Sequence, residues 1–171
     1  MADGEDVARA FDEFYVGTRG RLVHQLYALT GNTADAQECV QEAYARAWQR
    51  WSQVASYDDP EAWVRTVARR IATSRWRKAR NRVAAYRRHG EPPTVPGPGP
   101  ETVALIDALR RLPEAQRVAL VLHHLCGRSV QEIADEARVP VGTVKARLSR
   151  GRAALAPLLD DDATHEEGTH V

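Results

Sequence analysis

The stretch of residues 129–152, SVQEIADEARVPVGTVKARLSRGR, has the pattern of two helices joined by a tight turn. Ser129 and Glu132 form a capping box, in which each side chain accepts a hydrogen bond from the backbone amide of the other residue and so begins a helix. Ile133 and Ala137 of that helix are expected to face the core. The residues Arg-Val-Pro at 138–140 predict the turn, because proline does not continue a helix that begins before it.

The helix over 141–155 has two different faces. Apolar residues at helical spacing predict its buried side, with Gly151 permitting a close helix contact; they are Val141, Val144, Leu148 and Leu155. The other side combines small residues near the helix start with longer cations: Gly142, Thr143, Lys145, Ala146, Ser149, Arg150 and Ala153. Such a face suits the major groove of DNA, and the pattern predicts a DNA-binding helix-turn-helix. The alternative is a helical hairpin whose basic face binds nothing.

Basic residues are concentrated in two zones, although 24 Lys and Arg nearly balance 23 Asp and Glu. Residues 65–88 contain nine Arg, one Lys and no acid, and residues 141–155 again contain bases and no acid. Two basic zones on a nearly neutral chain indicate two contacts with one polyanion. The alternative is that both are solvated helix faces.

One segment divides the chain. Residues 90–100, GEPPTVPGPGP, contain five prolines and three glycines, which continue neither a helix nor a strand. With few aromatic residues and much Ala, Val and Leu, we expect an all-α fold of two small helical domains joined by a Pro/Gly-rich linker. The expected parts are a first domain at 1–88, a linker at 89–100, a helix-turn-helix domain at 101–159 and an acidic, disordered tail at 160–171.

In the first domain, Gly31 is placed to end a helix, and Asn32 or Thr33 to cap the next one, which runs to about residue 50. A loop is expected over 52–60. A further helix then runs from 61 past 77, with Trp63, Val67 and Ile71 on its apolar face and with Arg65, Arg69 and Arg70 off that face.

In the second domain, Pro113 suits the first position of a helix. Val118, Leu122 and Leu125 are expected to form the buried face of that helix, which ends at Gly127.

Several classes of function have no support in the sequence. Cys39 and Cys126 match no disulfide or zinc spacing, and His123 with Cys126 lacks further metal ligands, so no cofactor or metal is expected. The chain has no nucleophile elbow or phosphate-binding loop, and we expect no enzymatic activity. It has no signal peptide or membrane span, so we expect a cytoplasmic protein without membrane insertion.

The stretch 129–152 resembles region four of the sigma-70 family. Residues 35–48, DAQECVQEAYARAW, and 60–70, PEAWVRTVARR, resemble region two. A chain with only these two regions resembles the extracytoplasmic-function (group 4) sigma factors, in particular the actinobacterial sigma-E type. The likeness covers about residues 11–155, and it departs from the family at Arg70 and Ser74, where Asn and Asp are common.

The resemblance implies a sigma factor that binds core RNA polymerase and directs transcription from promoters. It implies that one stripe docks on the β′ clamp helices: Asp35, Glu38, Gln41 and Glu42. It implies that a second set contacts the −10 element: Tyr57, Asp58, Trp63, Arg69, Arg70 and Arg77. It implies that a third set contacts the −35 element: Thr143, Lys145, Ala146, Arg147, Ser149, Arg150 and Arg152.

Some of these roles have alternatives. Trp63 is more often a core residue than a stacking platform, and the acidic stripe could be a solvated helix face. The β flap of the polymerase and an anti-sigma protein are further implied partners. The rival functions are a stand-alone helix-turn-helix regulator with a helical sensor domain, and a protein-interaction module.

Overall fold

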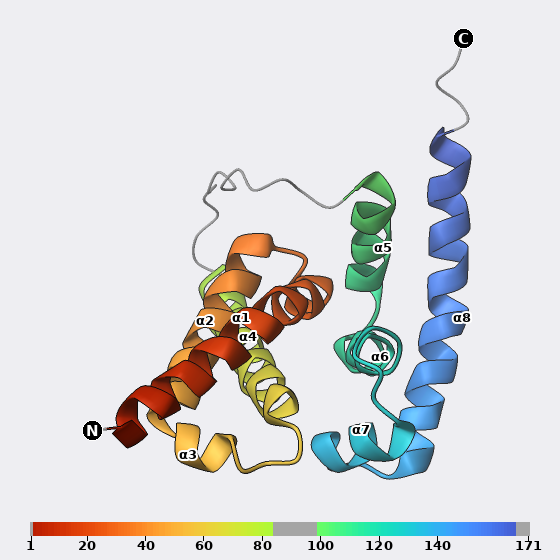
Figure 1. Ribbon diagram of the computed structural model, residues 1–171. Coiled ribbons are helices and arrows are strands. Elements are labelled where there is room, and N and C mark those ends of the chain that lie inside the picture. Colours follow the sequence, from red (N-terminus) through yellow and green to blue (C-terminus); the bar gives the residue numbers. More distant parts are fainter. Residues whose placement is uncertain (1, 84–98, 167–171) are drawn as a thin grey trace. The chain divides into compact units, whose positions relative to one another are not determined.

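The computed structural model describes residues 2–83 and 99–166, and all secondary structure within them is helical. The chain divides into two compact units, 1–94 and 95–171 (Figure 1). The all-α fold expected from the sequence is confirmed. Most of the expected linker lies outside the described residues; Gly99 precedes the first helix of unit 2, and Pro100 is already its first residue.

Unit 1 contains α1 (Ala2–Thr30), α2 (Thr33–Gln49), α3 (Trp51–Val54) and α4 (Pro60–Val83). Gly31 separates α1 from α2 with a positive φ of 67°, a conformation that glycine adopts at little cost. Asn32 then caps α2, because its side chain accepts a hydrogen bond of 3.0 Å from the Asp35 amide. Both boundaries agree with the sequence prediction.

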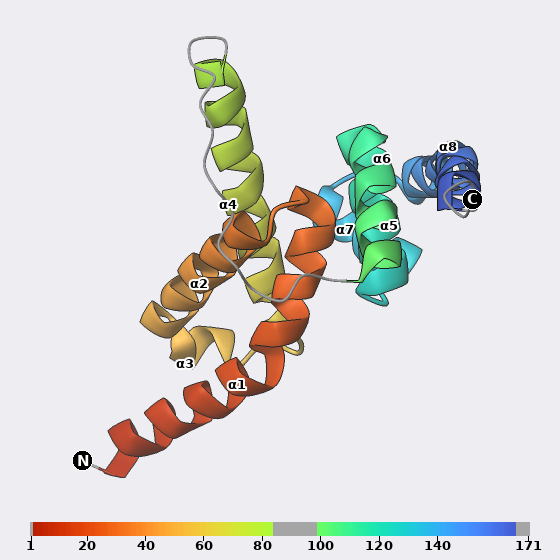
Figure 2. The ribbon, with the colours of Figure 1, turned by 90° about the horizontal axis from the view of Figure 1, so that it is seen from above.

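The core of unit 1 lies where α1, α2 and α4 pack together (Figure 2). Leu22 and Leu26 of α1, Val40 of α2, and Val64 and Ala68 of α4 are fully buried in it. Burial of each large aliphatic side chain contributes roughly 1.5–3 kcal/mol relative to exposure. An aromatic group extends this core toward α3; Phe14, for example, lies 5.1 Å from Trp51 between ring centroids.

Two expectations for unit 1 were wrong. Arg65 was placed off the buried face of its helix, yet it is only 4% exposed. The reason is that α4 packs against both α1 and α2. Two neighbouring helices cover more of its surface than the single stripe of apolar residues that was used to predict its buried face. The loop expected over 52–60 begins with the short helix α3, in which the Arg50 carbonyl accepts hydrogen bonds from the Gln53 and Val54 amides.

Unit 2 contains α5 (Pro100–Arg111), α6 (Glu114–Leu120), the π-helix η1 (Val121–Leu125), α7 (Val130–Ala137) and α8 (Val141–Glu166). Pro113 is the residue before α6 rather than its first residue, and its carbonyl accepts hydrogen bonds from the Gln116 and Arg117 amides.

The π-helix changes which side chains are buried. The Cys126 amide donates to the Val121 carbonyl at 3.1 Å, five residues back instead of four. Leu122 is buried as expected, but Leu125 is 47% exposed, so its predicted burial was wrong. A wider turn rotates the last residues away from the face that an α-helix would bury.

The helix-turn-helix consists of α7, a turn and α8, as predicted. The capping box is present, with hydrogen bonds of 3.1 Å from the Glu132 amide to the Ser129 hydroxyl and 2.7 Å from the Ser129 amide to the Glu132 carboxylate. Arg138 ends α7 in the left-handed conformation, with φ of 54°. Ile133 and Ala134 are buried, whereas Ala137, expected in the core, is exposed on the last turn.

On the buried side of α8, Val144 and Leu148 are at most 2% exposed. Gly151 faces α6 so closely that an added Cβ would lie 3.0 Å from Leu120 Cδ1. The expected close helix contact at Gly151 is therefore present.

The last helix is longer than expected. α8 continues to Glu166, whereas residues 160–171 were expected to be disordered; of these, 167–171 lie outside the described residues. Residues 158–166 contain no Gly or Pro, and an established helix gains one hydrogen bond for each residue added. An acidic composition alone therefore does not end the helix.

Replacing Gly151 with Val should destabilise unit 2 by about 1–3 kcal/mol, because the added methyl groups meet buried Leu120 in filled space. All tryptophans lie in unit 1, so their fluorescence reports the unfolding of that unit, whereas circular dichroism reports both. We expect a lower urea midpoint in circular dichroism and an unchanged one in fluorescence. Gly142→Ala is the control, since no atom lies within 4 Å of its added Cβ; equal stability of the two variants would contradict the packing argument.

Candidate nucleic-acid interface

The outward face of α8 presents the residues predicted for the −35 element. Lys145, Ser149, Arg150 and Arg152 are exposed, and Thr143, Ala146 and Arg147 are half-buried. Because Val144 and Leu148 on the other side are buried, the helix has one anchored face and one free face. The structure thus places all seven predicted residues on one helix.

The start of α8 is open to a partner. The Pro140 carbonyl accepts hydrogen bonds from the Thr143 and Val144 amides and begins the helix. Gly142 is exposed and has open space where a Cβ would stand. A helix with small residues at its start can lie deep in a groove, with the cations farther along it reaching bases or phosphates.

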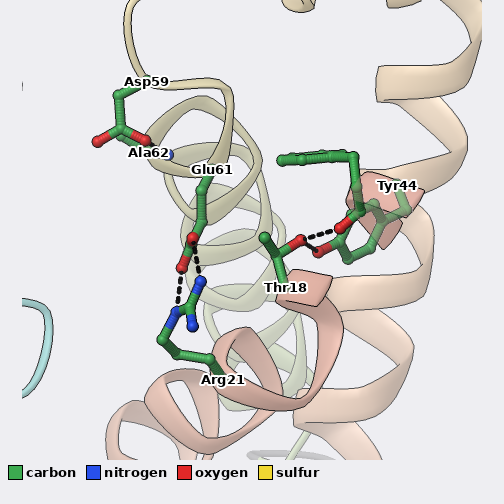
Figure 3. Close-up of polar contacts among 7 residues, drawn as sticks. Thr18, Arg21, Tyr44, Asp59, Glu61 and Ala62 are labelled. Atoms are coloured by element: carbon green, nitrogen blue, oxygen red, sulfur yellow. Dashed lines mark hydrogen bonds and ion pairs between the residues drawn. The ribbon is translucent and has the colours of Figure 1, made fainter. Parts of the chain in front are cut away.

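The loop between α3 and α4 presents the first residues predicted for the −10 element. Tyr57 is 39% exposed, and Asp58 is exposed. The following residue has a structural role, because the Asp59 carboxylate accepts a hydrogen bond of 2.8 Å from the Ala62 amide and caps α4 (Figure 3). An exposed aromatic ring on a loop with a fixed end can stack on an unpaired base.

The remaining residues predicted for the −10 element lie on α4. Trp63 is half-buried and packs against the core of unit 1, in agreement with its packing alternative. Arg69 is half-buried and Arg70 is exposed. The side chain of Arg77 lies outside the described residues.

An ion pair joins the first turn of α4 to α1. Arg21 Nε and Nη2 donate to the two Glu61 carboxylate oxygens at 2.8 and 2.6 Å (Figure 3). The hydrogen bond and charge of Glu61 raise the pKa of Arg21. This two-point contact holds the end of the loop that carries Tyr57, because Glu61 directly follows Pro60 at the start of α4.

A second polar contact links α1 to α2. The hydroxyl groups of Thr18 and Tyr44 are hydrogen-bonded, and the Thr18 hydroxyl also donates to the Phe14 carbonyl at 2.7 Å (Figure 3). Burial raises the pKa of Tyr44 to about 12, although the Thr18 hydrogen bond opposes this. Tyr44 therefore stays neutral at physiological pH and acts in packing.

The acidic stripe predicted to dock on polymerase lies on α2. Asp35, Glu38 and Gln41 are exposed and Glu42 is half-buried. Arg75 of α4 donates to Glu38 and to Glu42, each at 2.8 Å, and Arg46 also pairs with Glu42. Burial raises the pKa of Glu42, but the hydrogen bonds from Arg75 and Arg46 outweigh it and leave that pKa lowered.

Arg75 was missed by sequence reasoning, although a signal was present. It lies four residues after Ile71, at the same spacing as Trp63, Val67 and Ile71. The apolar face of α4 packs against α2, so the residue that continues this face meets the acids of α2. Its basic character placed it with the DNA-binding zone instead.

Comparison with known proteins assigns the two units. Residues 14–82 match the family Sigma-70 region 2, and residues 102–155 match the family Sigma-70, region 4. The chain is 32% identical over 140 residues to the ECF RNA polymerase sigma factor SigL of Mycobacterium tuberculosis, which covers 78% of this chain and 79% of SigL. This chain belongs to the extracytoplasmic-function sigma factors of the sigma-70 family. The family consists of regulatory DNA-binding proteins.

SigJ agrees with this membership, and a more distant solved structure shares the fold. The sigma chain is 35% identical over 168 residues to SigJ of Mycobacterium tuberculosis, and it spans only 53% of the length of SigJ. The crystal structure of SigJ matches with a TM-score of 0.59 and 30% identity, covering 85% of this chain and 53% of SigJ. The sigma factor RpoE from Bartonella quintana, crystallised with the anti-sigma factor NepR, shares the fold with a TM-score of 0.74, 22% identity, and coverage of 89% of this chain and 98% of RpoE.

In the described parts of this sigma factor, no three His, Cys, Asp or Glu side chains are grouped to hold a metal ion. No helix of the described segments combines the length and the hydrophobicity needed to cross a membrane.

Replacing Arg75 with Gln should lower the free energy of unfolding of unit 1 by less than about 1 kcal/mol near pH 7, because its ion pairs are largely exposed. Glu42 has a lowered pKa in the folded state, so its contribution is complete above its unfolded pKa and is lost as pH falls through its folded pKa. The difference between wild type and variant should therefore shrink below about pH 4.5, the ordinary glutamate pKa.

Tryptophan-monitored urea unfolding at several pH values checks this, with Arg9→Gln as the control. Arg9 pairs with Asp6 within α1 alone and does not join two helices. A loss in Arg75→Gln that stays constant from pH 7 to pH 3 would show that the ion pairs are not its cause.

Proposed function

We propose that this chain is a sigma factor that binds core RNA polymerase and directs initiation at promoters with −35 and −10 elements. The observation that carries the proposal is that regions 2 and 4 of the sigma-70 family occur in one chain, the second with an exposed, basic recognition helix. The proposed activity is regulatory, with no chemical reaction of its own, and its place is the cytoplasm, where the polymerase acts.

In this proposal α8 binds the −35 element in the major groove. Lys145, Ala146, Ser149 and Arg150 contact base edges, and Thr143, Arg147 and Arg152 lie nearer the phosphates. A bidentate arginine contact to guanine discriminates by about 1–3 kcal/mol between bases. Phosphate contacts supply affinity that depends on salt and not on sequence.

Unit 1 is proposed to open the −10 element. Tyr57 and Asp58 would border the pocket for an unstacked base, and Arg69, Arg70 and Arg77 would hold the backbone of the separated strand. Extruding a base costs a few kcal/mol, which stacking on an aromatic ring and ionic contacts can offset. Trp63 would contribute through the part of its ring that remains exposed.

The acidic stripe on α2 is proposed to dock on the β′ clamp helices, and unit 2 on the β flap. Glu38 and Glu42 both pair with the Arg75 guanidinium, and these ion pairs are largely exposed. A basic surface of the partner could therefore replace Arg75 with little loss of free energy. We extend to this chain an anti-sigma protein as a further partner, since one similarly folded sigma factor, RpoE, has been crystallised with an anti-sigma factor.

Run-off transcription with core polymerase and a promoter library tests the proposal. We expect specific transcripts only when the chain is added. A stand-alone regulator would instead bind duplex sites without polymerase and would never produce promoter-specific initiation, and that outcome would reject the sigma function.

Arg150→Ala should relax selectivity at one base pair of the −35 element, at a cost of about 1–3 kcal/mol for the preferred base. Selection of promoter variants by polymerase carrying the mutant chain measures this. Arg19→Ala is the control, because Arg19 is an exposed arginine on α1 outside both proposed DNA contacts. If Arg150→Ala instead lowered the affinity equally for every promoter variant, Arg150 would contact a phosphate and not a base.

Asp35→Asn with Glu38→Gln should weaken binding to core polymerase by about tenfold, equal to about 1.4 kcal/mol. Fluorescence titration of labelled chain with core polymerase gives the affinity. Glu13→Gln is the matched control, since Glu13 is an exposed acid on α1 outside the stripe. Equal affinity of the double variant and the control would show that the stripe is a solvated helix face and does not bind polymerase.

A further inference from the structure

A single arginine holds two acids of the proposed docking stripe. Arg75 Nη1 donates to Glu38 Oε2 and Arg75 Nη2 donates to Glu42 Oε2, each at 2.8 Å. Glu38 and Glu42 are four residues apart on α2, so they lie on the same side of that helix. The two outer nitrogens of one guanidinium therefore bridge the two carboxylates.

This arginine comes from a different helix than the acids that it binds. α4 packs against α2 and brings Arg75 to the stripe. Arg46 also pairs with Glu42, but it belongs to α2 itself and follows Glu42 by about one turn. Arg75 is thus a positive charge that tertiary packing adds to the stripe.

The two arginines neutralise most of the charge of the stripe. Its acids are Asp35, Glu38 and Glu42, which carry three negative charges at neutral pH. Arg46 and Arg75 add two positive charges, which leaves a net charge of −1. Without Arg75 the net charge would be −2, and the attraction for a basic surface would be stronger.

The ion pairs of Arg75 can open without unfolding the unit. The side chain of Arg75 is 44% exposed and that of Glu38 is 68% exposed. Ion pairs with this exposure contribute little to stability, because water solvates both partners when they separate. Val64 and Ala68, which are fully buried in the core, anchor α4 independently of them. The Arg75 side chain can therefore leave the acids while its helix stays in place.

We propose that Arg75 is an internal competitor of core RNA polymerase for the acidic stripe. Its guanidinium occupies Glu38 and Glu42 in the free chain, and a basic surface of the polymerase displaces it. The proposal rests on the proposed function, because that function makes the stripe the docking surface. It adds an autoinhibitory contact, which holds the affinity below the value that the acids alone would give and disfavours weakly basic partners.

Replacing Arg75 with Gln should strengthen binding to core polymerase by about threefold at low salt. The partner then displaces no bound guanidinium and meets one more net negative charge, and the effect is small because the ion pairs are exposed. The gain should shrink as the salt concentration rises, since salt screens exposed charges. Fluorescence titration of labelled full chain with core polymerase measures it.

Arg9→Gln is the matched control, because it also removes an arginine of unit 1 that is paired with an acid, but outside the stripe. It should keep the wild-type affinity. Binding of Arg75→Gln that is equal to wild type, or weaker, overturns the proposal; weaker binding would mean that Arg75 arranges the acids for the partner.

A double-mutant background tests whether the gain passes through the acids. With Glu38→Gln and Glu42→Gln both present, no carboxylate of the pair remains for Arg75 to occupy. Adding Arg75→Gln to this background should then leave the affinity unchanged. A threefold gain that persists there would come from the general loss of a positive charge and would overturn the competition.

A second measurement does not depend on the polymerase. A labelled peptide of six arginines serves as the basic probe, and fluorescence anisotropy gives its affinity for the full chain. Arg75→Gln should bind the peptide more tightly than Arg9→Gln does, and equal affinities overturn the proposal. If this difference is found but wild type neither binds core polymerase nor starts promoter-specific transcription, the sigma function fails while the internal competition stands.

Discussion

The close approach of α8 to α6 at Gly151 is the constraint on which the exposed basic face of α8 depends. The α8 backbone can lie against Leu120 only because residue 151 has no side chain. Val144 and Leu148 are buried on the same side of α8. Since residues three to four apart share one side of a helix, this anchoring leaves Lys145, Ser149 and Arg150 exposed on the other. The left-handed residue Arg138 and the capping box of α7 set the direction in which α8 begins.

Ionic contacts divide the basic residues into two groups. Arg21 and Arg75 are bound to acids of their own unit, to Glu61 and to the pair Glu38 and Glu42. Within the described residues, Lys145 and Arg150 have no such partner, so their charge is available to a polyanion. The number of Lys and Arg residues in a stretch of sequence does not separate these groups, because ion pairing depends on which helices pack against each other.

Local features of the fold could be predicted because each depends on residues close together in sequence. The capping box at Ser129, the glycine end of α1, the cap at Asn32 and the turn after Arg138 all need one or two neighbouring side chains. The exposed basic face of α8 could be predicted for the same reason, since one helix contains all of it. Arg65, Arg75 and Leu125 could not be placed in this way. Their surroundings come from helices distant in sequence, or from a change of helix type that leaves no strong local signal.

The sequence by itself determined the helical class, the ends of most helices, the two basic zones and the family to which the chain belongs. These properties follow from side-chain chemistry and helical periodicity, which act over a few residues. Only the tertiary structure decided which charges are free. Packing of α4 against both α1 and α2 buried Arg65 and directed Arg75 onto the acidic stripe. Charge interactions act through space, so their partners are set by the fold and not by the order of residues.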